Sequence, residues 1–110
     1  MNWFRHAPSA LEITPADAHS LISEGKAFLV DVRESYEWND GHAVPAKHIP
    51  FGELAARTHH LPKDREVLVI CESGSRSLAA ARWLSESGFP ARSVVGGTPA
   101  WSRAGLPLGR

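Results

Sequence analysis

Residues 66–86 read EVLVICESGSRSLAAARWLSE and contain the only cysteine of the chain, Cys71. An apolar run ends at this cysteine, small turn-forming residues follow, and a helix-forming segment comes next. The stretch therefore predicts a strand, a tight loop and a helix. This order places the sulfur at a helix N-terminus, where backbone N–H groups and the helix dipole favour negative charge. Cys71 is thus a candidate thiolate at the end of a buried strand.

The same alternation of strand and helix extends outward from this stretch. The apolar run of residues 27–32 predicts a second strand covered on both faces, and the helix before it begins at Thr14 and Pro15 and ends at Gly25. Shorter strands are expected at residues 9–13, 46–50 and 91–97, and further helices at residues 33–42, 52–61, 75–88 and 98–105. We therefore expect one domain over residues 1–110, an α/β three-layer sandwich whose central, mainly parallel sheet is flanked by helices.

Composition excludes several classes of partner. Twelve basic and twelve acidic residues give a net charge of zero, so no general nucleic-acid surface is expected. No apolar run approaches the roughly 20 residues of a membrane span, and the N-terminal MNWFRHAPSALEITP lacks the apolar centre of a signal peptide. A single cysteine cannot form an internal disulfide, so a cytoplasmic location is expected.

Two strand ends define the candidate site, because ligands of such sheets bind beyond the carboxyl ends of the strands. Cys71 and Asp31 each lie at one of these ends. A lone cysteine is most often a small buried apolar residue, and Arg76 alone could be an ordinary charge on a helix surface. Gly74, two serines and Arg76 within five residues after the cysteine instead favour a cradle for a thiolate and an anion.

Four blocks of this sequence resemble, in the same order, the single-domain rhodanese family of sulfurtransferases. The blocks are LVDVRESYEW (29–38), GHAVPAKHIP (41–50), VICESGSRS (69–77) and VVGGTPAWSRAGLPL (94–108). With the helix before them, the resemblance covers about residues 11–108. It implies transfer of a sulfane sulfur from a donor such as thiosulfate to cyanide or a thiol, through a persulfide on Cys71. The reaction that this resemblance implies requires no metal or organic cofactor.

The resemblance also assigns roles around the cysteine. The loop wraps the sulfur with its N–H groups turned inward, and Arg76 attracts the anionic donor. The serine hydroxyls either donate hydrogen bonds to sulfur or serve as turn and cap residues. The predicted site comprises the catalytic Cys71, the loop residues Glu72, Ser73, Gly74, Ser75, Arg76 and Ser77, and the supporting residues Asp31 and Arg33.

Two departures from the family pattern concern the substrate and the backbone. Glu72 stands where many thiosulfate-using members have a basic or aromatic residue, and a carboxylate there opposes a dianion. Pro45 stands where glycine is usual, which suggests a local backbone change. His42 is given a structural role. His59 and His60 are neighbours on a predicted helix, where their side chains diverge by about 100° and form no chelating pair.

Alternatives remain open at this stage. Four residues separate Cys71 from Arg76, whereas related phosphatases and arsenate reductases have five, so an oxyanion-binding bowl is disfavoured. A non-enzymatic interaction, regulatory or sulfur-carrier module is the main alternative. The expected partners are a small-molecule sulfur donor and a thiol or cyanide acceptor, with a protein acceptor as a further option. The oligomeric state is open, with a monomer as the default.

Overall fold

The central element of the computed structural model, which describes residues 9–110, is a five-stranded sheet whose neighbouring strands all run parallel. The prediction that the N-terminal residues 1–15 form no signal peptide concerns a segment that lies partly outside this range, because residues 1–8 are not described. The strand order is β1-β6-β5-β2-β4, with β1 Glu12–Ile13, β2 Ala27–Asp31, β4 Lys47–His48, β5 Glu66–Ile70 and β6 Ala91–Val94. The expected α/β fold with a parallel sheet is confirmed.

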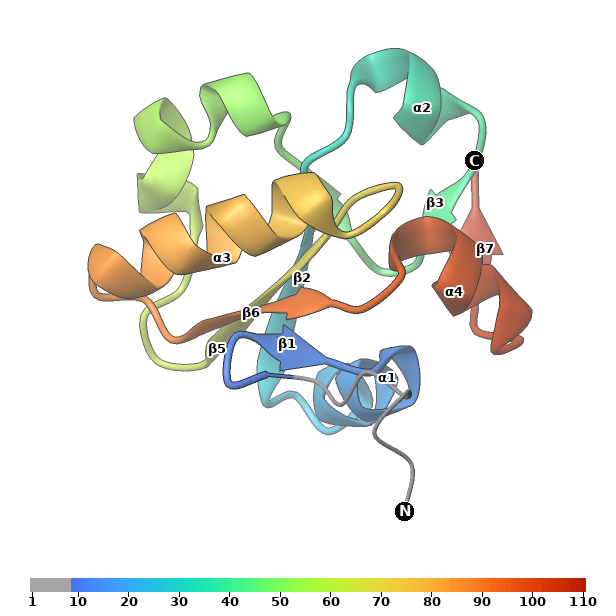
Figure 1. Cartoon of the computed structure of the whole chain (residues 1–110), viewed down its shortest axis with the longest axis horizontal. Helices are drawn as coiled ribbons and strands as arrows, with labels where there is room; N and C mark the ends of the chain where they lie inside the picture. Colours follow the sequence, from blue (N-terminus) through green and yellow to red (C-terminus); the bar gives the residue numbers. More distant parts are fainter. Residues whose placement is uncertain (1–8) are drawn as a thin grey trace.

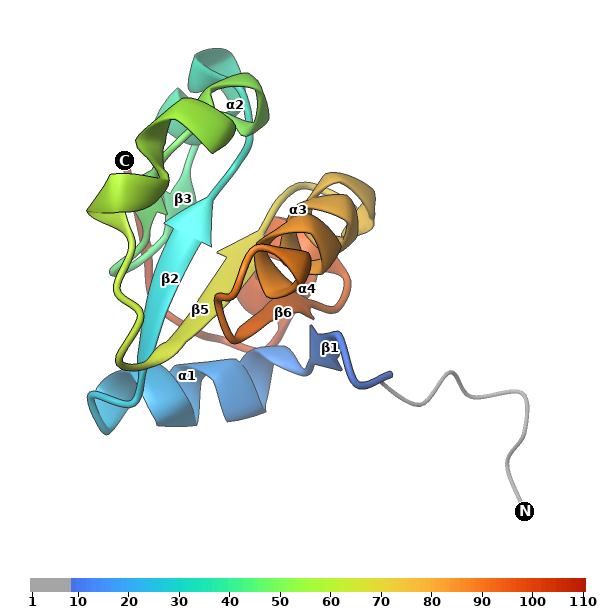
Figure 2. The same ribbon diagram turned by 90° about the vertical axis from the view of Figure 1, so that its left-hand side faces the viewer.

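Two helical layers cover this sheet (Figure 1, Figure 2). Helices α1 (Pro15–Ser23) and α4 (Gly97–Arg103) contribute Ala18 and Trp101 to a core on one face, and α3 (Ser75–Glu86) packs on the other. Alternate residues of β5 point to opposite layers, with Val67 and Val69 toward α3 and Leu68 and Ile70 toward α1 and α4. Both faces of the central strands are therefore buried, as their apolar runs predict.

Helix α1 begins where local sequence predicts. The Thr14 side chain accepts a hydrogen bond from the backbone N–H of Asp17 at 3.2 Å, and Pro15 occupies the first helical position. Short helix α2 (Ser35–Asn39) follows β2 and lies at the carboxyl edge of the sheet. Its start is a capping box in which the backbone N–H of Glu34 donates to Glu37 at 3.0 Å.

The expected helix at residues 52–61 is instead two 3₁₀ segments, η1 Phe51–Glu53 and η2 Ala55–His60. Arg57 has φ −119° and ψ 18°, which breaks any regular helix, and the two segments bury no residue of their own. Only Leu54 and Leu61 anchor the region to the core, too few for an amphipathic helix face. The predicted divergence of His59 and His60 was also wrong, because their rings make an edge contact with centroids 4.2 Å apart.

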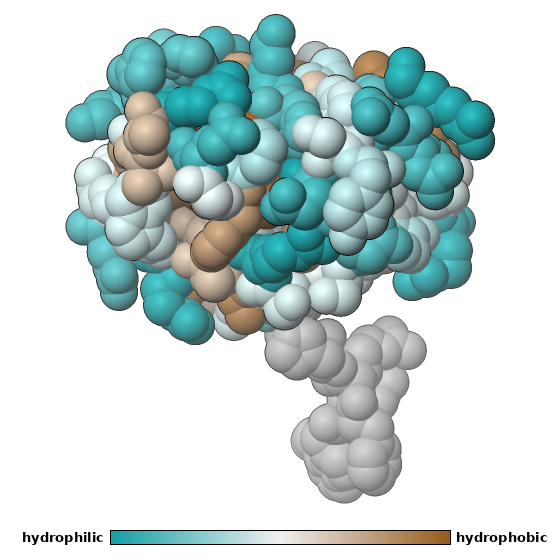
Figure 3. Space-filling view, turned by 90° about the horizontal axis from the view of Figure 1, so that it is seen from above, coloured by the Kyte–Doolittle hydropathy of each residue, from teal (hydrophilic) through white to brown (hydrophobic). Residues whose placement is uncertain are grey.

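Two smaller features were not anticipated. A second, antiparallel sheet joins β3 (His42–Ala43) to β7 (Leu108–Gly109), two strands too short to leave a periodic signal. The sequence of α3 predicts an apolar stripe of Leu78, Ala81 and Leu84, but Leu78 is only half-buried, and Ser77 and Ala80 are buried with the other two. The face of the molecule seen from above is mostly hydrophilic, with a narrow apolar strip (Figure 3). Among residues 9–110 no helix has the length and apolar character needed to span a bilayer.

Candidate active site

Cys71 directly follows β5 and lies at the same sheet edge as Asp31, whose register partner is Ile70. The loop after it turns through Gly74, which has φ +103°, a conformation that favours glycine. Gly97 of α4 approaches the loop so closely that a Cβ there would collide with the carbonyl oxygens of Cys71 and Glu72. The loop is therefore fixed by a second segment, far from it in sequence.

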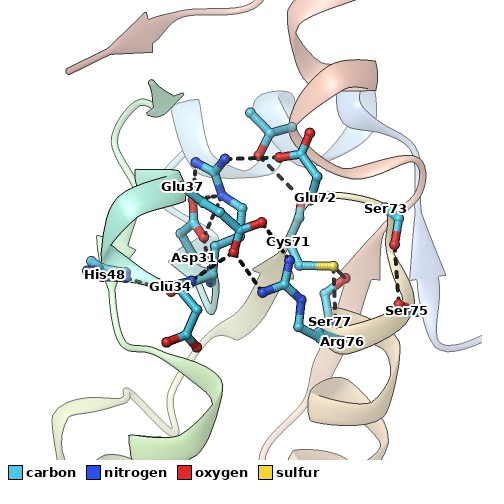
Figure 4. A network of polar contacts seen from close by, with 12 residues as sticks. Asp31, Glu34, Glu37, His48, Cys71, Glu72, Ser73, Ser75, Arg76 and Ser77 are labelled. Atoms are coloured by element: carbon cyan, nitrogen blue, oxygen red, sulfur yellow. Dashed lines mark hydrogen bonds and ion pairs between the residues drawn. The ribbon is translucent and has the colours of Figure 1, made fainter. Parts of the chain in front are cut away.

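The sulfur of Cys71 is fully buried and receives backbone donors. The N–H of Gly74 lies 3.0 Å from Sγ and the N–H of Ser77 lies 3.3 Å from it, while the thiol is 3.3 Å from Ser77 Oγ (Figure 4). The first turn of α3 thus directs N–H groups at the sulfur, which stabilises a negative charge there. Ser73 and Ser75 instead hydrogen-bond each other at 3.2 Å on the exposed side of the loop.

Ser93 is a site residue that sequence analysis missed. Its hydroxyl on β6 lies 2.7 Å from Ser77 Oγ, and both serines are buried. A serine between Arg92 and Val94 in a short predicted strand was the only available signal, and it carries no information about its partner. The pairing depends on how β6 lies beside β5.

Asp31 and Arg33 form a buried ion pair that extends to the loop. Arg33 Nε lies 3.1 Å from both carboxylate oxygens of Asp31, and Nη1 donates to Glu72 Oε1 at 3.1 Å. Burial alone would lower the pKa of Arg33, but the hydrogen bonds and charges of Asp31 and Glu72 raise it overall. The structure therefore brings the two supporting residues next to the loop, where they hold Glu72.

Arg76 forms a bidentate ion pair with Glu37 of α2, with N···O distances of 2.8 and 2.9 Å. Hydrogen bonding from Arg76 lowers the pKa of Glu37 to about 2, so the carboxylate is charged, and Glu37 in turn raises the pKa of Arg76. A negative charge at Cys71 would be a further, smaller cause that raises the pKa of Arg76. Sequence analysis missed Glu37, whose only signal was its capping position.

A cavity of about 400 Å³ opens beside the loop. Its lining combines one guanidinium, one aromatic ring, one amide and three carboxylates, from Arg33, Tyr36, Asn39, Glu37, Asp40 and Glu72. Arg33 and the nearby Arg76 both already pair with carboxylates. A small molecule entering here meets compensated cations and an excess of negative charge.

The histidines of the site region take part in ring stacking. His42 stacks on Trp38 with centroids 3.5 Å apart, and its Nδ1 lies 3.0 Å from the Trp38 carbonyl oxygen. These contacts suit the structural role expected for His42. Within residues 9–110, no three His, Cys, Asp or Glu side chains gather in a way that could hold a metal ion.

Comparisons with known proteins agree on one family. The model of the rhodanese-like domain matches residues 14–104. A Bacillus subtilis (strain 168) protein named "Putative sulfurtransferase YtwF" is 36% identical over 88 residues, which cover 80% of this chain and 85% of that protein.

Solved structures give the same result. A rhodanese-related protein from Thermoplasma volcanium superposes with a TM-score of 0.81 at 34% identity, covering 89% of this chain and 96% of the other. A rhodanese-like domain protein from Staphylococcus aureus has a TM-score of 0.75 at 30% identity, with coverage of 82% and 89%.

Proposed function

We propose that this chain, which belongs to the rhodanese-like domain family, is a sulfurtransferase that carries a sulfane sulfur as a persulfide on Cys71. The observation that supports this most strongly is the position of the sulfur at the N-terminus of α3, where it accepts hydrogen bonds from two backbone N–H groups. Those donors favour the anionic forms of both the thiol and the persulfide. This environment supports a nucleophilic role for the single cysteine.

The reaction consists of two displacements at sulfur. In the first, the Cys71 thiolate attacks the outer sulfur of thiosulfate, the S–S bond of the donor breaks, and sulfite leaves with the bonding electron pair. In the second, cyanide or a thiolate attacks the outer sulfur of the Cys71 persulfide. The new bond gives thiocyanate or a small persulfide, and the electron pair of the broken S–S bond returns to Cys71 as thiolate.

Loop residues stabilise the thiolate and persulfide anions of Cys71 through hydrogen bonds and charge. The N–H groups of Gly74 and Ser77 and the Ser77 hydroxyl face the sulfur. Arg76 has five N–H donors, of which Glu37 accepts two, so the others remain for an anionic donor. Glu37 therefore fixes the guanidinium in place but reduces its net attraction for anions.

Two alternatives are less well supported by the geometry. A phosphatase or arsenate reductase needs a wider loop than the four residues between Cys71 and Arg76 provide. A purely non-catalytic interaction module has no need of a buried thiol surrounded by N–H donors. A cytoplasmic location suits the mechanism, because a reducing environment keeps the single thiol free and supplies small thiol acceptors.

Mass spectrometry of the intact protein tests this proposal. After incubation with thiosulfate and removal of excess donor, the mass should rise by one sulfur atom and fall again when cyanide is added. Cys71→Ser is the control and should gain nothing. Steady-state rates should give parallel double-reciprocal lines, as expected for a ping-pong mechanism. Absence of any sulfur adduct with thiosulfate and with small-molecule persulfides would contradict the proposal and favour an interaction module.

A further inference from the structure

Two buried hydroxyls form a chain that starts at the sulfur of Cys71. Ser77 Oγ lies 3.3 Å from Sγ, and Ser93 Oγ lies 2.7 Å from Ser77 Oγ. Ser77 is 0% exposed and Ser93 is 2% exposed, so water does not complete their hydrogen bonding. The short distance between the two oxygens marks a strong hydroxyl–hydroxyl contact in which either oxygen can be the donor.

The direction of this chain depends on the charge of the sulfur. When Cys71 is a thiol, its S–H donates to Ser77 Oγ, and the Ser77 hydroxyl donates either to Ser93 Oγ or to the Gly74 carbonyl oxygen at 3.2 Å. When Cys71 is a thiolate, Ser77 can turn its proton to the sulfur. Its oxygen then loses the S–H donor, and Ser93 is the neighbour able to donate in its place.

We propose that Ser93 is a positioning residue that acts through Ser77 to stabilise the anionic sulfur of Cys71. By donating to Ser77 Oγ, Ser93 frees the Ser77 proton for the sulfur and strengthens that hydrogen bond through cooperativity. This inference rests on the proposed function, in which the thiolate and the persulfide anion are the working states. No heavy atom needs to move, because only the two hydroxyl protons rotate.

A structural role alone would give different behaviour. If Ser93 served only to tie β6 to the loop, its removal would lower stability without changing how readily the thiol ionises. The ion-paired side chains around the loop stay unchanged in the variants. They are Asp31 at the end of β2, Arg33 just after it, Glu37 on α2, Glu72 on the loop and Arg76 on α3.

The test measures the rate of Cys71 alkylation by iodoacetamide as a function of pH, because only the thiolate reacts. Ser93→Ala should move the midpoint of the rate profile to higher pH and lower the rate at neutral pH by about three- to tenfold, the scale of one weakened hydrogen bond to a charged group. Ser77→Ala should shift the midpoint and lower the alkylation rate at least as much as Ser93→Ala. Ser85→Ala removes a hydroxyl that also links α3 to β6, 3.4 Å from the Ala91 carbonyl oxygen, and should leave the profile unchanged.

The double variant decides whether Ser93 acts through Ser77. We call the hydrogen-bond chain from Ser93 through Ser77 to the sulfur of Cys71 the relay. Ser77→Ala combined with Ser93→Ala should have the same pH profile as Ser77→Ala alone, because the first substitution already breaks the relay. Additive shifts, or an unchanged profile for Ser93→Ala, would overturn the inference. Ser93→Thr and Ser93→Val form a matched pair with equal bulk. The Thr variant should retain the native profile and the Val variant should lose it, even if both lower thermal stability.

The outcome is separable from that of the proposed function. Alkylation reports thiolate formation whether or not the protein transfers sulfur. A shifted profile in a protein that never gains a sulfur adduct would leave the relay standing and remove the sulfurtransferase proposal. If Ser93→Ala forms the sulfur adduct normally and its alkylation profile is not shifted, the sulfurtransferase proposal would stand and the relay would be refuted.

Discussion

The site has two parts that stabilise charge in different ways. The floor is made of the buried Cys71, Ser77 and Ser93 together with the partly buried Gly74, and it uses neutral donors, namely backbone N–H groups and hydroxyls. The mouth, made of Arg33, Glu37, Glu72 and Arg76, uses full charges arranged in ion pairs that are partly exposed.

This difference separates the chemistry from the selection of the substrate. Fixed dipoles in a buried floor are little screened by salt, so they should govern thiolate formation and the chemical step. Paired charges at a partly exposed mouth are screened, so they should govern which donor enters and how binding depends on ionic strength. Changes to the floor should therefore affect the turnover number, and changes to the mouth should affect the Michaelis constant.

Removing the sulfur is the largest change to the floor. Cys71→Ser should lower sulfur transfer to background, because a serine oxygen is not ionised near neutral pH and forms no persulfide. The free energy of unfolding should change by less than about 1 kcal/mol, since the side chains are similar in size. Thiocyanate formation with thiosulfate and cyanide measures the activity, and circular dichroism checks the fold. Turnover above background in this variant would refute the covalent mechanism.

Gly97→Ala should displace the floor without removing any hydrogen-bonding side chain of the site. The added Cβ would meet the carbonyl oxygens of Cys71 and Glu72, and the residue has φ +62°. We expect a loss of about 3 kcal/mol in stability, from strain and overpacking together, and at least a tenfold fall in the rate of persulfide formation.

Gly105→Ala is the matched control for this change. Gly105 has φ +75°, but a Cβ there has no atom within 4 Å. It should therefore show the backbone cost alone, about 1 kcal/mol, with normal activity. Equal losses of activity in Gly97→Ala and Gly105→Ala would mean that the close contact between Gly97 and the loop does not determine the rate of persulfide formation.

Glu72→Gln tests the mouth, because it removes one negative charge while its amide oxygen can still accept from Arg33. The Michaelis constant for thiosulfate should fall about threefold at low salt, with little change in the turnover number. At 1 M salt, where the Debye length is about 3 Å, the advantage should disappear. Glu86→Gln at the other end of α3 is the control and should change neither constant. A change in turnover number that persists in high salt would assign Glu72 to the floor.

The smallest expected effect is a pH dependence of stability from the Glu37–Arg76 pair. Arg76 lowers the pKa of Glu37 to about 2, below its usual 4.5, so the unfolded state binds more protons between these values. The contribution is therefore complete above about pH 4.5 and is lost as the pH falls toward 2. Because Arg76 is 34% exposed, solvent screening limits it to about 1 kcal/mol.

Urea unfolding of the native protein and of Glu37→Gln measures this contribution. The difference in the free energy of unfolding should be about 1 kcal/mol at pH 6 and should shrink steadily toward pH 3. A difference that stays constant over this range would show that the pair does not titrate as described.

Local sequence was sufficient for the elements that carry the nucleophile. The run EVLVI, the glycine after it and the segment that follows predict β5, the loop and α3, because an apolar strand run, a turn former and a helix-forming segment are each local signals. Thr14 and Pro15 likewise predict the start of α1. The weak point was residues 52–61, where helix-forming residues lack a continuous apolar face and 3₁₀ segments result.

What the sequence determined by itself was thus the fold class, the position of Cys71 at a helix N-terminus, and the loop that follows it. Only the tertiary structure decided which groups complete the floor and the mouth. Glu37 meets Arg76 from 39 positions away, and Ser93 meets Ser77 from 16 positions away. Such contacts depend on the order of parallel strands and on the packing of helices across them, whereas sequence periodicity records only which face of its own element a residue occupies.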